Sequence, residues 1–293
     1  MSVITSKESK TFKELQRLTQ KKYRDREGLF IAEGPNVVGE AIDQDEIDVL
    51  RIFAREGSGY EDYTDNTVVL SDKLFDTVSD TVTSQGVIAV VRKPDRGTAA
   101  DVMQRLSDGI KTSGAAGRGT KVSGASDGIK TSGDVIVLDR LQDPGNIGTI
   151  LRTAEGAGIK AAIFIKGTCD PFSPKVVRAC AGSILRMPIV FCDTAEEFIK
   201  IAADTGCKLA VTDVRNGVPY YRAGLSRAVE TPEKGTAERS PIALVIGNEG
   251  NGVSDTFLKA ADILVNIPMH GKLESLNASV AAALLMYEMS RPE

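Results

Sequence analysis

The sequence predicts an α/β protein with a small N-terminal domain and a C-terminal domain built on a parallel sheet. Its 293 residues exceed the roughly 100–200 that one domain usually needs. Apolar runs of strand length alternate with helical stretches throughout residues 134–293. Such near-continuous apolar strands are typical of a parallel sheet covered by helices on both faces. A Gly/Ser-rich stretch separates this pattern from the N-terminal third.

Residues 1–96 are predicted to form the smaller domain. An amphipathic helix is expected over 7–22, because Phe12, Leu15 and Leu18 recur at helical spacing between basic residues. Short apolar runs predict strands at 29–32, 49–54, 67–70 and 86–91, with helices around 35–42 and 71–78. The alternation of the two element types again indicates an α/β domain.

Residues 97–133 are predicted to be a flexible linker. The octapeptide SDGIKTSG occurs at 107–114 and again at 126–133, and AAGRGTKVSGA lies between the two copies. With so few large apolar side chains, this stretch cannot bury enough surface to offset the entropy of ordering. A short helix is allowed at 99–106. We read the repeat as a duplication within a tolerant linker and assign it no function.

Residues 134–293 are predicted to form the second domain. Its strands are expected at 135–138, 161–165, 189–191, 209–212, 242–246 and 263–267. Ligands of parallel sheets bind beyond the carboxyl ends of the strands. The loops that follow these strands are therefore the places to look for chemistry.

Charge is distributed unevenly along the chain. The net charge of −4 does not indicate a nucleic-acid-binding protein. Residues 1–26, however, contain eight basic and three acidic residues, whereas residues 27–96 contain six basic and fifteen acidic ones. A basic arm on an acidic body is a local footprint for a polyanion, and a solvated helix face would give the same pattern.

Several classes of protein are disfavoured by composition. The longest uncharged apolar run, 279–287, is too short to span a bilayer, and the charged N-terminus lacks the apolar core of a secretory signal. We therefore expect a cytoplasmic protein. The single histidine and the absence of a CxxC pair argue against a metal site. The cysteines are expected to be buried, reduced thiols: Cys169, Cys180, Cys192 and Cys207.

The first candidate loop follows the strand at 135–138. DPGN (143–146) turns into a helix that carries Arg152. Gly145 and Gly148 permit close approach of the backbone, and a helix N-terminus suits an anion such as phosphate. Arg152 lies six residues after Asn146 and could meet the same ligand. A capped helix with a solvated arginine would give the same pattern.

The second and third candidate loops come late in the chain. GNEGNG (247–252) holds three glycines but matches neither a Walker A loop nor GxGxxG, and Glu249 could simply accept N–H bonds within it. Ser254 is the expected N-cap of the next helix. The third loop leads into a helix from about residue 275, where capping alone would explain Ser275 and Asn277. That helix is apolar on two faces, so it is expected to be buried or shared with a partner subunit.

In this order, the three loops resemble the motifs of the SpoU (TrmH-type) branch of the SPOUT RNA methyltransferases. The resemblance covers nearly all of residues 134–293, through DPGNIGTILRTAEGAG, LVIGNEGNGV and IPMHGKLESLNASVAAALLMYE. Less specifically, KELQRLTQKKYRDREGLFIAEGPNVVGEAI and SQGVIAVVRKP are similar to the substrate-binding domain of that family.

The resemblance implies an activity and a set of site residues. The family transfers a methyl group from S-adenosylmethionine to a ribose 2′-hydroxyl of ribosomal or transfer RNA, works as homodimers, and ties its C-terminal domain into a trefoil knot. By motif, the catalytic residue is Arg152, with Asn146, Glu249, Ser275 and Asn277 as its partners. The implied cofactor positions are Thr212, Gly247, Ile267, Met269, Leu276 and Asn277. The basic arm would then contact RNA through Lys21, Lys22 and Arg24.

Two other functions remain open at this point. A nucleotide-binding oxidoreductase also fits a parallel sheet with glycine loops, but no GxGxxG follows the first strand. A non-catalytic RNA-binding or ribosome-assembly protein could use the same fold, although the motif residues are intact. Ribosomal RNA is the first expected substrate and transfer RNA the second. Cofactor affinity would separate both rival functions from a methyltransferase.

Overall fold

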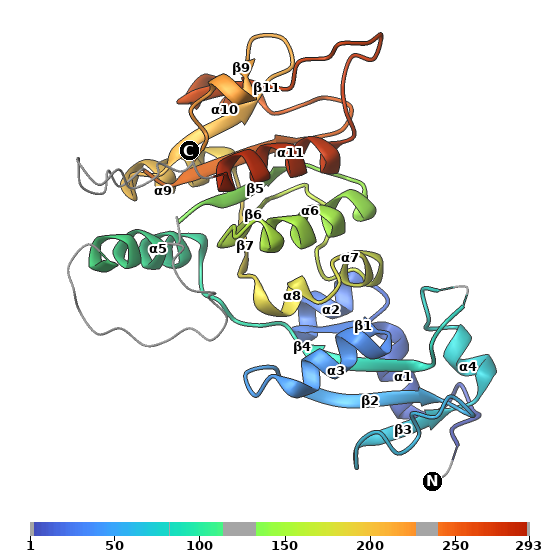
Figure 1. Cartoon of the computed structure of the whole chain (residues 1–293). Coiled ribbons are helices and arrows are strands. Elements are labelled where there is room, and N and C mark those ends of the chain that lie inside the picture. Colours follow the sequence, from blue (N-terminus) through green and yellow to red (C-terminus); the bar gives the residue numbers. More distant parts are fainter. Residues whose placement is uncertain (1–2, 82, 114–132, 227–239, 292–293) are drawn as a thin grey trace. The chain divides into compact units, whose positions relative to one another are not determined.

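The computed structural model describes residues 3–81, 83–113, 133–226 and 240–291, and it divides the chain into two compact units. Figure 1 labels their elements. The segments of unit 1 are Met1–Asp95, Asp143–Arg152 and Asp170–Arg186. The segments of unit 2 are Arg96–Gln142, Thr153–Cys169 and Met187–Glu293. Two short segments from the predicted C-terminal domain therefore cluster with the N-terminal one.

Unit 1 is built on a four-stranded sheet in the order β1-β4-β2-β3. β4 pairs antiparallel with β1 and β2, whereas the edge strand β3 runs parallel to β2. All four predicted strands are confirmed, and two helices lie where the sequence predicts them. These elements are β1 (Leu29–Glu33), α3 (Pro35–Asp43), β2 (Val49–Arg55), β3 (Thr67–Leu70), α4 (Asp72–Asp76) and β4 (Val87–Arg92).

The N-terminal amphipathic segment forms two helices rather than the single helix predicted over 7–22. They are α1 (Lys10–Arg17) and α2 (Lys21–Glu27), with an extended residue between them. Arg24 stabilises the break, because its Nη1 donates to the carbonyl oxygens of Leu18 and Thr19 at 2.8 Å each. Carbonyl groups at the end of a helix have no partner within it, so a side-chain donor satisfies them.

The apolar core of unit 1 joins α1, the sheet and α4. Phe12, Leu15 and Leu18, the residues whose spacing predicted the helix, are all at most 2% exposed. They pack with apolar side chains of the four strands and of the α4 region. The hydrophobic periodicity therefore identified the buried face correctly, although it missed the break.

Unit 2 is built on a seven-stranded sheet in the order β7-β6-β5-β10-β8-β11-β9. All its pairings are parallel, which confirms the predicted class of sheet. The six predicted strands are present, and the two-residue strand β9 is an addition. The strands are β5 (Val135–Asp139), β6 (Ala161–Ile165), β7 (Ile189–Cys192), β8 (Lys208–Thr212), β9 (Val218–Pro219), β10 (Ile242–Gly247) and β11 (Ile263–Asn266).

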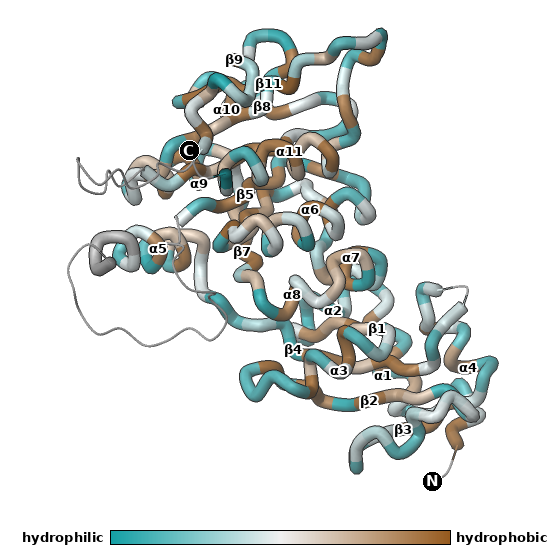
Figure 2. The backbone as a smooth tube through the Cα atoms, in the orientation of Figure 1, coloured by the Kyte–Doolittle hydropathy of each residue, from teal (hydrophilic) through white to brown (hydrophobic). Residues whose placement is uncertain are grey.

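Helices cover both faces of this sheet. On one face, α5 (Ala99–Ser113), α9 (Ala195–Asp204) and α10 (Asp255–Ala260) share an apolar core with alternate strand residues. α11 (Ala278–Ser290) contacts β10 but contributes nothing to that core, so it covers the opposite face (Figure 1). Figure 2 shows α11 as largely hydrophobic, as expected for a helix that is apolar on more than one side.

The first part of the predicted linker is a helix that packs in unit 2. Ala99, Val102 and Met103 of α5 are at most 3% exposed and belong to the core shared with α9. The short helix allowed at 99–106 is therefore present and extends to Ser113, because the apolar residues at 99–106 suffice to bury one helix face. Residues 107–113 of the first repeat copy fall within α5, whereas residues 114–132, with most of the second copy, lie outside the described residues.

Three further helices carry or adjoin the candidate residues. α6 (Pro144–Gly156) follows β5, while α7 (Pro174–Ala179) and α8 (Ser183–Arg186) come from the last segment of unit 1, where α7 packs on β1. A Cβ atom at Gly148 of α6 would lie 2.4 Å from Cβ of Ala179, so glycine permits the contact with α7. None of the helices in the described ranges has the length and apolar character needed to cross a bilayer.

Candidate functional site

The first loop leads from β5 into α6. Asp143 caps the helix, because its Oδ1 accepts the N–H of Asn146 at 2.8 Å, and Pro144 occupies the first turn. Asn146 is 8% exposed, whereas Arg152 is exposed two turns along. The capped start predicted from DPGN is therefore present, with Asp143 as the capping side chain.

The second loop, 247–254, is folded tightly on itself after β10. A Cβ atom at Gly247 would lie 2.2 Å from the nitrogen of Val253, so no larger residue fits. Asn248 and Gly252 exchange two backbone hydrogen bonds of 3.0 and 2.9 Å, which close the turn. Glycine at 247 is thus required by close approach, as the sequence indicated.

The second loop is also bonded to the first. The exposed Glu249 accepts the backbone N–H of Gln142 at 3.1 Å, and the buried Asp139 accepts the N–H of Ser254 at 2.7 Å. Ser254 occupies the N-cap position of α10 but makes no side-chain cap. Its Oγ is buried and, within the described residues, lacks a hydrogen-bond partner. Ser254 therefore lies at the expected N-cap position, but its side chain does not form the expected capping hydrogen bond.

The third loop ends at the cap of α11. Asn277 is the N-cap, and its Oδ1 accepts from the N–H of Ser279 at 2.9 Å and of Val280 at 3.4 Å. The helix begins at Ala278 rather than near residue 275, so the exposed Ser275 lies in the loop before it. Of the two residues that capping could explain, only Asn277 caps the helix.

Several of the predicted cofactor positions follow the carboxyl ends of neighbouring strands in unit 2. β10, β8 and β11 are parallel neighbours, so Thr212, Gly247 and the residues after Asn266 come at the same end of three adjacent strands. Ile267, Met269 and Leu276 are partly buried. Thr212 donates from its Oγ1 to the carbonyl oxygen of Val245 at 3.1 Å, and this bond joins β8 to β10.

The basic N-terminal residues divide into exposed and buried members. Lys21 and Lys22 are exposed, and Lys21 pairs with Asp25. Arg24 is 3% exposed, and its guanidinium binds Asp170 Oδ2 at 2.6 and 3.1 Å as well as two carbonyl groups. The prediction that Arg24 contacts RNA is therefore corrected, because its guanidinium is buried and forms an ion pair with Asp170 inside unit 1.

The remaining candidates for chemistry are weak. Three cysteines are buried and Cys169 is partly buried, and all four are free thiols. Burial, with the nearby carboxylates of Glu197 and Asp193, raises the pKa of Cys192 to about 12, so that thiol stays protonated. Among the described residues, no cluster of three histidine, cysteine or acidic side chains could hold a metal ion.

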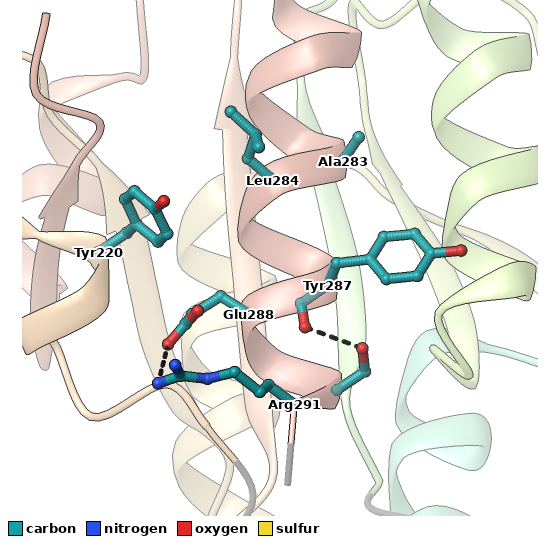
Figure 3. Close-up of a pocket in the computed structure, with 7 residues that line it drawn as sticks. Tyr220, Ala283, Leu284, Tyr287, Glu288 and Arg291 are labelled. Carbon is teal, nitrogen blue, oxygen red and sulfur yellow. Dashed lines mark hydrogen bonds and ion pairs between the residues drawn. The ribbon is translucent and has the colours of Figure 1, made fainter. Parts of the chain in front are cut away.

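An open groove runs beside α11 in unit 2. Figure 3 shows Leu284 and Tyr220 on one side of the helix and the ring of Tyr287 extending away on the other. Val280, Leu284 and Tyr287 are 41–56% exposed, whereas Leu285 and Met289 of the same helix are buried. One of the two predicted apolar faces is thus packed on unit 2, and the other is exposed.

Comparison with known proteins decides the family. Residues 134–287 match the SpoU rRNA Methylase family, and residues 9–89 match the MRM3-like substrate binding domain. The chain belongs to the SpoU rRNA methylase family. It is also 30% identical, over 99% of both chains, to the 23S rRNA (guanosine(2553)-2′-O)-methyltransferase RlmP of Bacillus subtilis. A putative TrmH family tRNA/rRNA methyltransferase of Staphylococcus aureus is 37% identical over 54% of this chain and 58% of its own.

Solved structures of family members extend the match to the whole fold. An AdoMet-bound rRNA methyltransferase from Sinorhizobium meliloti superposes with a TM-score of 0.74, at 26% identity, over 98% of this chain and 97% of that one. An RNA 2′-O ribose methyltransferase superposes with a TM-score of 0.72, at 26% identity, over 98% of each chain. The resemblance read from the three loops is therefore confirmed for this SpoU-family chain.

Sequence reasoning missed the side chains that hold the loops together. Asp139, Gln142 and Asn248 each bond a segment distant in the chain, and the last two stand beside residues that the motifs emphasise. Asp170, the partner of Arg24, carried no signal at all, because the two residues are 146 positions apart.

Proposed function

We propose that this chain transfers the methyl group of S-adenosylmethionine to a ribose 2′-hydroxyl of ribosomal RNA. The observation that carries the proposal is the full-length similarity to the Bacillus subtilis enzyme, which is named as a 2′-O-methyltransferase of 23S rRNA. Transfer RNA is the second candidate substrate, because the Staphylococcus relative is described as a tRNA/rRNA methyltransferase. Activity on cytoplasmic RNA would place the protein in the cytoplasm.

The residues at the edge of the unit 2 sheet fit this cofactor. Backbone groups dominate there, since Gly247 has no side chain and Thr212 uses its hydroxyl within the sheet. In addition, Asn266 Oδ1 is buried and has no hydrogen-bond partner among the described residues, while its Nδ2 donates to the carbonyl of Gly217 at 2.7 Å. A buried acceptor without a donor is costly, and a bound ligand would relieve that cost.

The cofactor would be held by backbone and apolar groups of three loops. We assign this role to Thr212, Gly247, Ile267, Met269, Leu276 and Asn277. When bound, S-adenosylmethionine supplies an activated methyl group. We also propose that these loops pass through one another in the family's trefoil knot. This part of the proposal rests on the resemblance to the family.

Arg152 is the residue to which we assign the central step. A ribose hydroxyl is a weak nucleophile and must be aligned with the methyl group. A guanidinium group has five N–H donors and no acceptor, so another group must take the proton. Arg152 instead binds the target phosphate and stabilises the negative charge that develops on the hydroxyl oxygen, and the proton leaves to water or a neighbouring group.

Four further residues complete the proposed site. We assign Asn146 and Glu249 to the first two motifs, and Ser275 and Asn277 to the third. Arg152 and Asn146 belong to unit 1, whereas Glu249, Ser275 and Asn277 belong to unit 2. Each assignment rests on the family motif that contains the residue.

The exposed lysines of the N-terminal helices are proposed to contact the RNA backbone. Lys21 and Lys22 project from α2, in the region that matches a substrate binding domain. Contacts to phosphate position a protein on RNA without reading its sequence. Arg24 is left out of this role because Asp170 holds its charge.

A homodimer is proposed through the exposed face of α11. Val280, Leu284 and Tyr287 present apolar surface beside the groove at Tyr220. Apolar surface that forms a contiguous patch on a helix is typical of an interface. Size-exclusion chromatography with light scattering would test this, and a monomer at micromolar concentration would overturn it.

Transfer of labelled methyl groups tests the activity. The purified chain is incubated with labelled S-adenosylmethionine and total RNA from a strain that lacks this gene, and 2′-O-methylation is mapped in the labelled RNA. We expect label at one nucleotide of ribosomal RNA, abolished in Arg152→Ala. Label in transfer RNA would support the second substrate. The absence of both label and cofactor binding would leave a non-catalytic RNA-binding protein.

A further inference from the structure

We propose that Gln142 and Asn248 are positioning residues that lock the first loop to the second in the geometry that the cofactor requires. The inference rests on the proposed function, because it concerns the same loops. It adds two residues that do not meet RNA or cofactor but hold the backbone that does. All the contacts that carry it lie within unit 2.

Asn248 uses both ends of its amide. Its Oδ1 accepts the backbone N–H groups of Gly250 and Asn251, each at 3.0 Å, and so holds the glycine-rich turn closed. Its Nδ2 donates to the carbonyl oxygen of Arg140 at 2.9 Å, across to the first loop. One side chain therefore shapes the second loop and ties it to the first.

Gln142 makes the reciprocal connection. Its Nε2 donates to the carbonyl oxygen of Arg140 at 2.9 Å and to that of Gly167 at 2.6 Å. Its backbone N–H donates to Glu249 Oε2 at 3.1 Å. Gln142 is therefore bonded within its own loop, to the loop after β6, and to the carboxylate of the second loop.

The shared acceptor, Arg140, has a strained backbone. Its φ of 60° lies in the left-handed region, which non-glycine residues rarely adopt. Such a conformation persists only when the surroundings over-determine it. Here the N–H of Arg140 donates to Thr168 Oγ1 at 2.9 Å, and its carbonyl accepts from both amides. The two side chains thus hold a backbone conformation that the sequence alone disfavours.

The position of these hydrogen bonds of Gln142 and Asn248, which we call the lock, explains their expected effect on the site. Gln142 immediately precedes Asp143, which caps the helix carrying Arg152. Asn248 immediately follows Gly247, a proposed cofactor contact, and precedes Glu249. Loosening the lock would therefore disturb the cofactor loop and the start of the catalytic helix while leaving both apolar cores untouched.

Asn248→Asp tests the lock with almost no change of shape. The aspartate keeps an acceptor for the N–H groups of Gly250 and Asn251, but it loses the donor to Arg140 and places a negative charge against that carbonyl. Gln142→Glu makes the same change on the other side. Asn251→Asp is the matched control. Asn251 is exposed in the same loop, and its side chain makes no hydrogen bond within the described part of the chain.

Two readouts separate this proposal from the proposed function. The first is the dissociation constant of S-adenosylmethionine without RNA, measured by calorimetry. The second is hydrogen–deuterium exchange of peptides that cover 139–145 and 247–254, measured without cofactor. We expect Asn248→Asp and Gln142→Glu to weaken cofactor binding at least tenfold and to speed exchange in both peptides. Asn251→Asp should stay within twofold of wild type, and the midpoint of thermal unfolding should change little.

The outcomes are distinct. Unchanged exchange and unchanged cofactor affinity in both variants would overturn the lock. Equal losses in Asn251→Asp would do the same, because added charge alone would then explain them. A wild-type chain that binds no S-adenosylmethionine would overturn the proposed function, and the exchange data would still decide whether the lock exists. If Asn248→Asp does not fold, Gln142→Glu provides the same test.

Discussion

Two pairs of interactions in unit 1 and unit 2 use charged side chains in different ways. In unit 1, two arginines pair with carboxylates far away in the chain, as in Arg24–Asp170 and Arg178–Asp80. In unit 2, carboxylates accept backbone N–H groups at the ends of strands, as Asp134 does from Ile242 and Asp139 does from Ser254. The first arrangement joins elements through two side chains, and the second shapes loops directly.

The difference teaches how charge in a sequence should be interpreted. A basic residue in unit 1 can be a surface contact or an internal tie, and its neighbours in sequence do not distinguish the two. Lys22 and Arg24 stand two positions apart, yet one is exposed and the other buried. An acidic residue beside a strand end in unit 2, such as Asp134 or Asp139, can accept a hydrogen bond from a backbone N–H of a neighbouring segment.

Removing the charge of Arg24 should produce the largest effect. Arg24→Ala leaves Asp170 buried without its partner, which costs about 3–5 kcal/mol of unfolding free energy. Replacing both residues, with Arg24→Met and Asp170→Leu, should restore only part of that loss. The buried charge is removed, but the carbonyl oxygens of Leu18 and Thr19 and the N–H of Phe172 lose their partners. Urea unfolding measures each variant.

A matched control sharpens this prediction. Arg26 is exposed and pairs with Glu27 on the surface, so Arg26→Ala should change the unfolding free energy by less than about 0.5 kcal/mol. A loss of under about 1 kcal/mol for Arg24→Ala would show that the buried pair does not hold unit 1 together.

Removing a hydrogen bond between a side chain and the backbone in unit 2 should have an intermediate effect on the unfolding free energy. Asp134 is fully buried and accepts the N–H of Ile242 at 2.8 Å, so Asp134→Ala should cost about 1–3 kcal/mol. Asp262 accepts the N–H of Leu209 at the same distance but is exposed, so water can replace it in Asp262→Ala. Chemical denaturation should show the larger loss for Asp134, and equal losses would contradict the importance of burial.

Charge reversal on α2 should affect RNA and spare the fold. Lys21→Glu with Lys22→Glu should weaken RNA binding about tenfold, equivalent to about 1.4 kcal/mol, and leave cofactor affinity unchanged. The slope of log affinity against log salt should fall by roughly 1.4–1.8 if both lysines contact phosphates. Lys73→Glu, an exposed change elsewhere in unit 1, is the control. Equal affinity in the double variant and wild type would remove the lysines from the interface.

The smallest expected effect concerns Asp25. Burial raises the pKa of Asp25. The hydrogen bonds and positive charges of Lys21 and Lys93 lower it by a larger amount, so the pKa of Asp25 lies below its ordinary value. A lowered pKa in the folded state contributes stability above the ordinary value of 3.8, and this contribution is lost as the pH falls through the folded value. The difference in unfolding free energy between wild type and Asp25→Asn should therefore shrink below about pH 4. A constant difference would contradict the pairing.

Local patterns predicted most of the fold. Near-continuous apolar runs located the six principal strands of unit 2, because a strand buried on both faces needs apolar residues at every position. The glycine at 247 and the cap at 277 were also correct, since each depends on neighbours within a few residues. The helix break after Arg17 and the packing of α5 were missed. The break depends on Arg24, which is held by Asp170 far along the chain, and α5 packs in a core shared with α9.

The sequence alone determined the parallel class of the unit 2 sheet, the three loops and the family to which the chain belongs. These features follow from residue spacing and from short motifs, which act over one or two turns of chain. Only the tertiary structure decided that Arg24 is an internal tie, that Ser275 precedes its helix, and that Gln142 and Asn248 join two loops. The physical reason is the same for all three: the partner of a polar group is set by proximity in space, and sequence distance does not encode it.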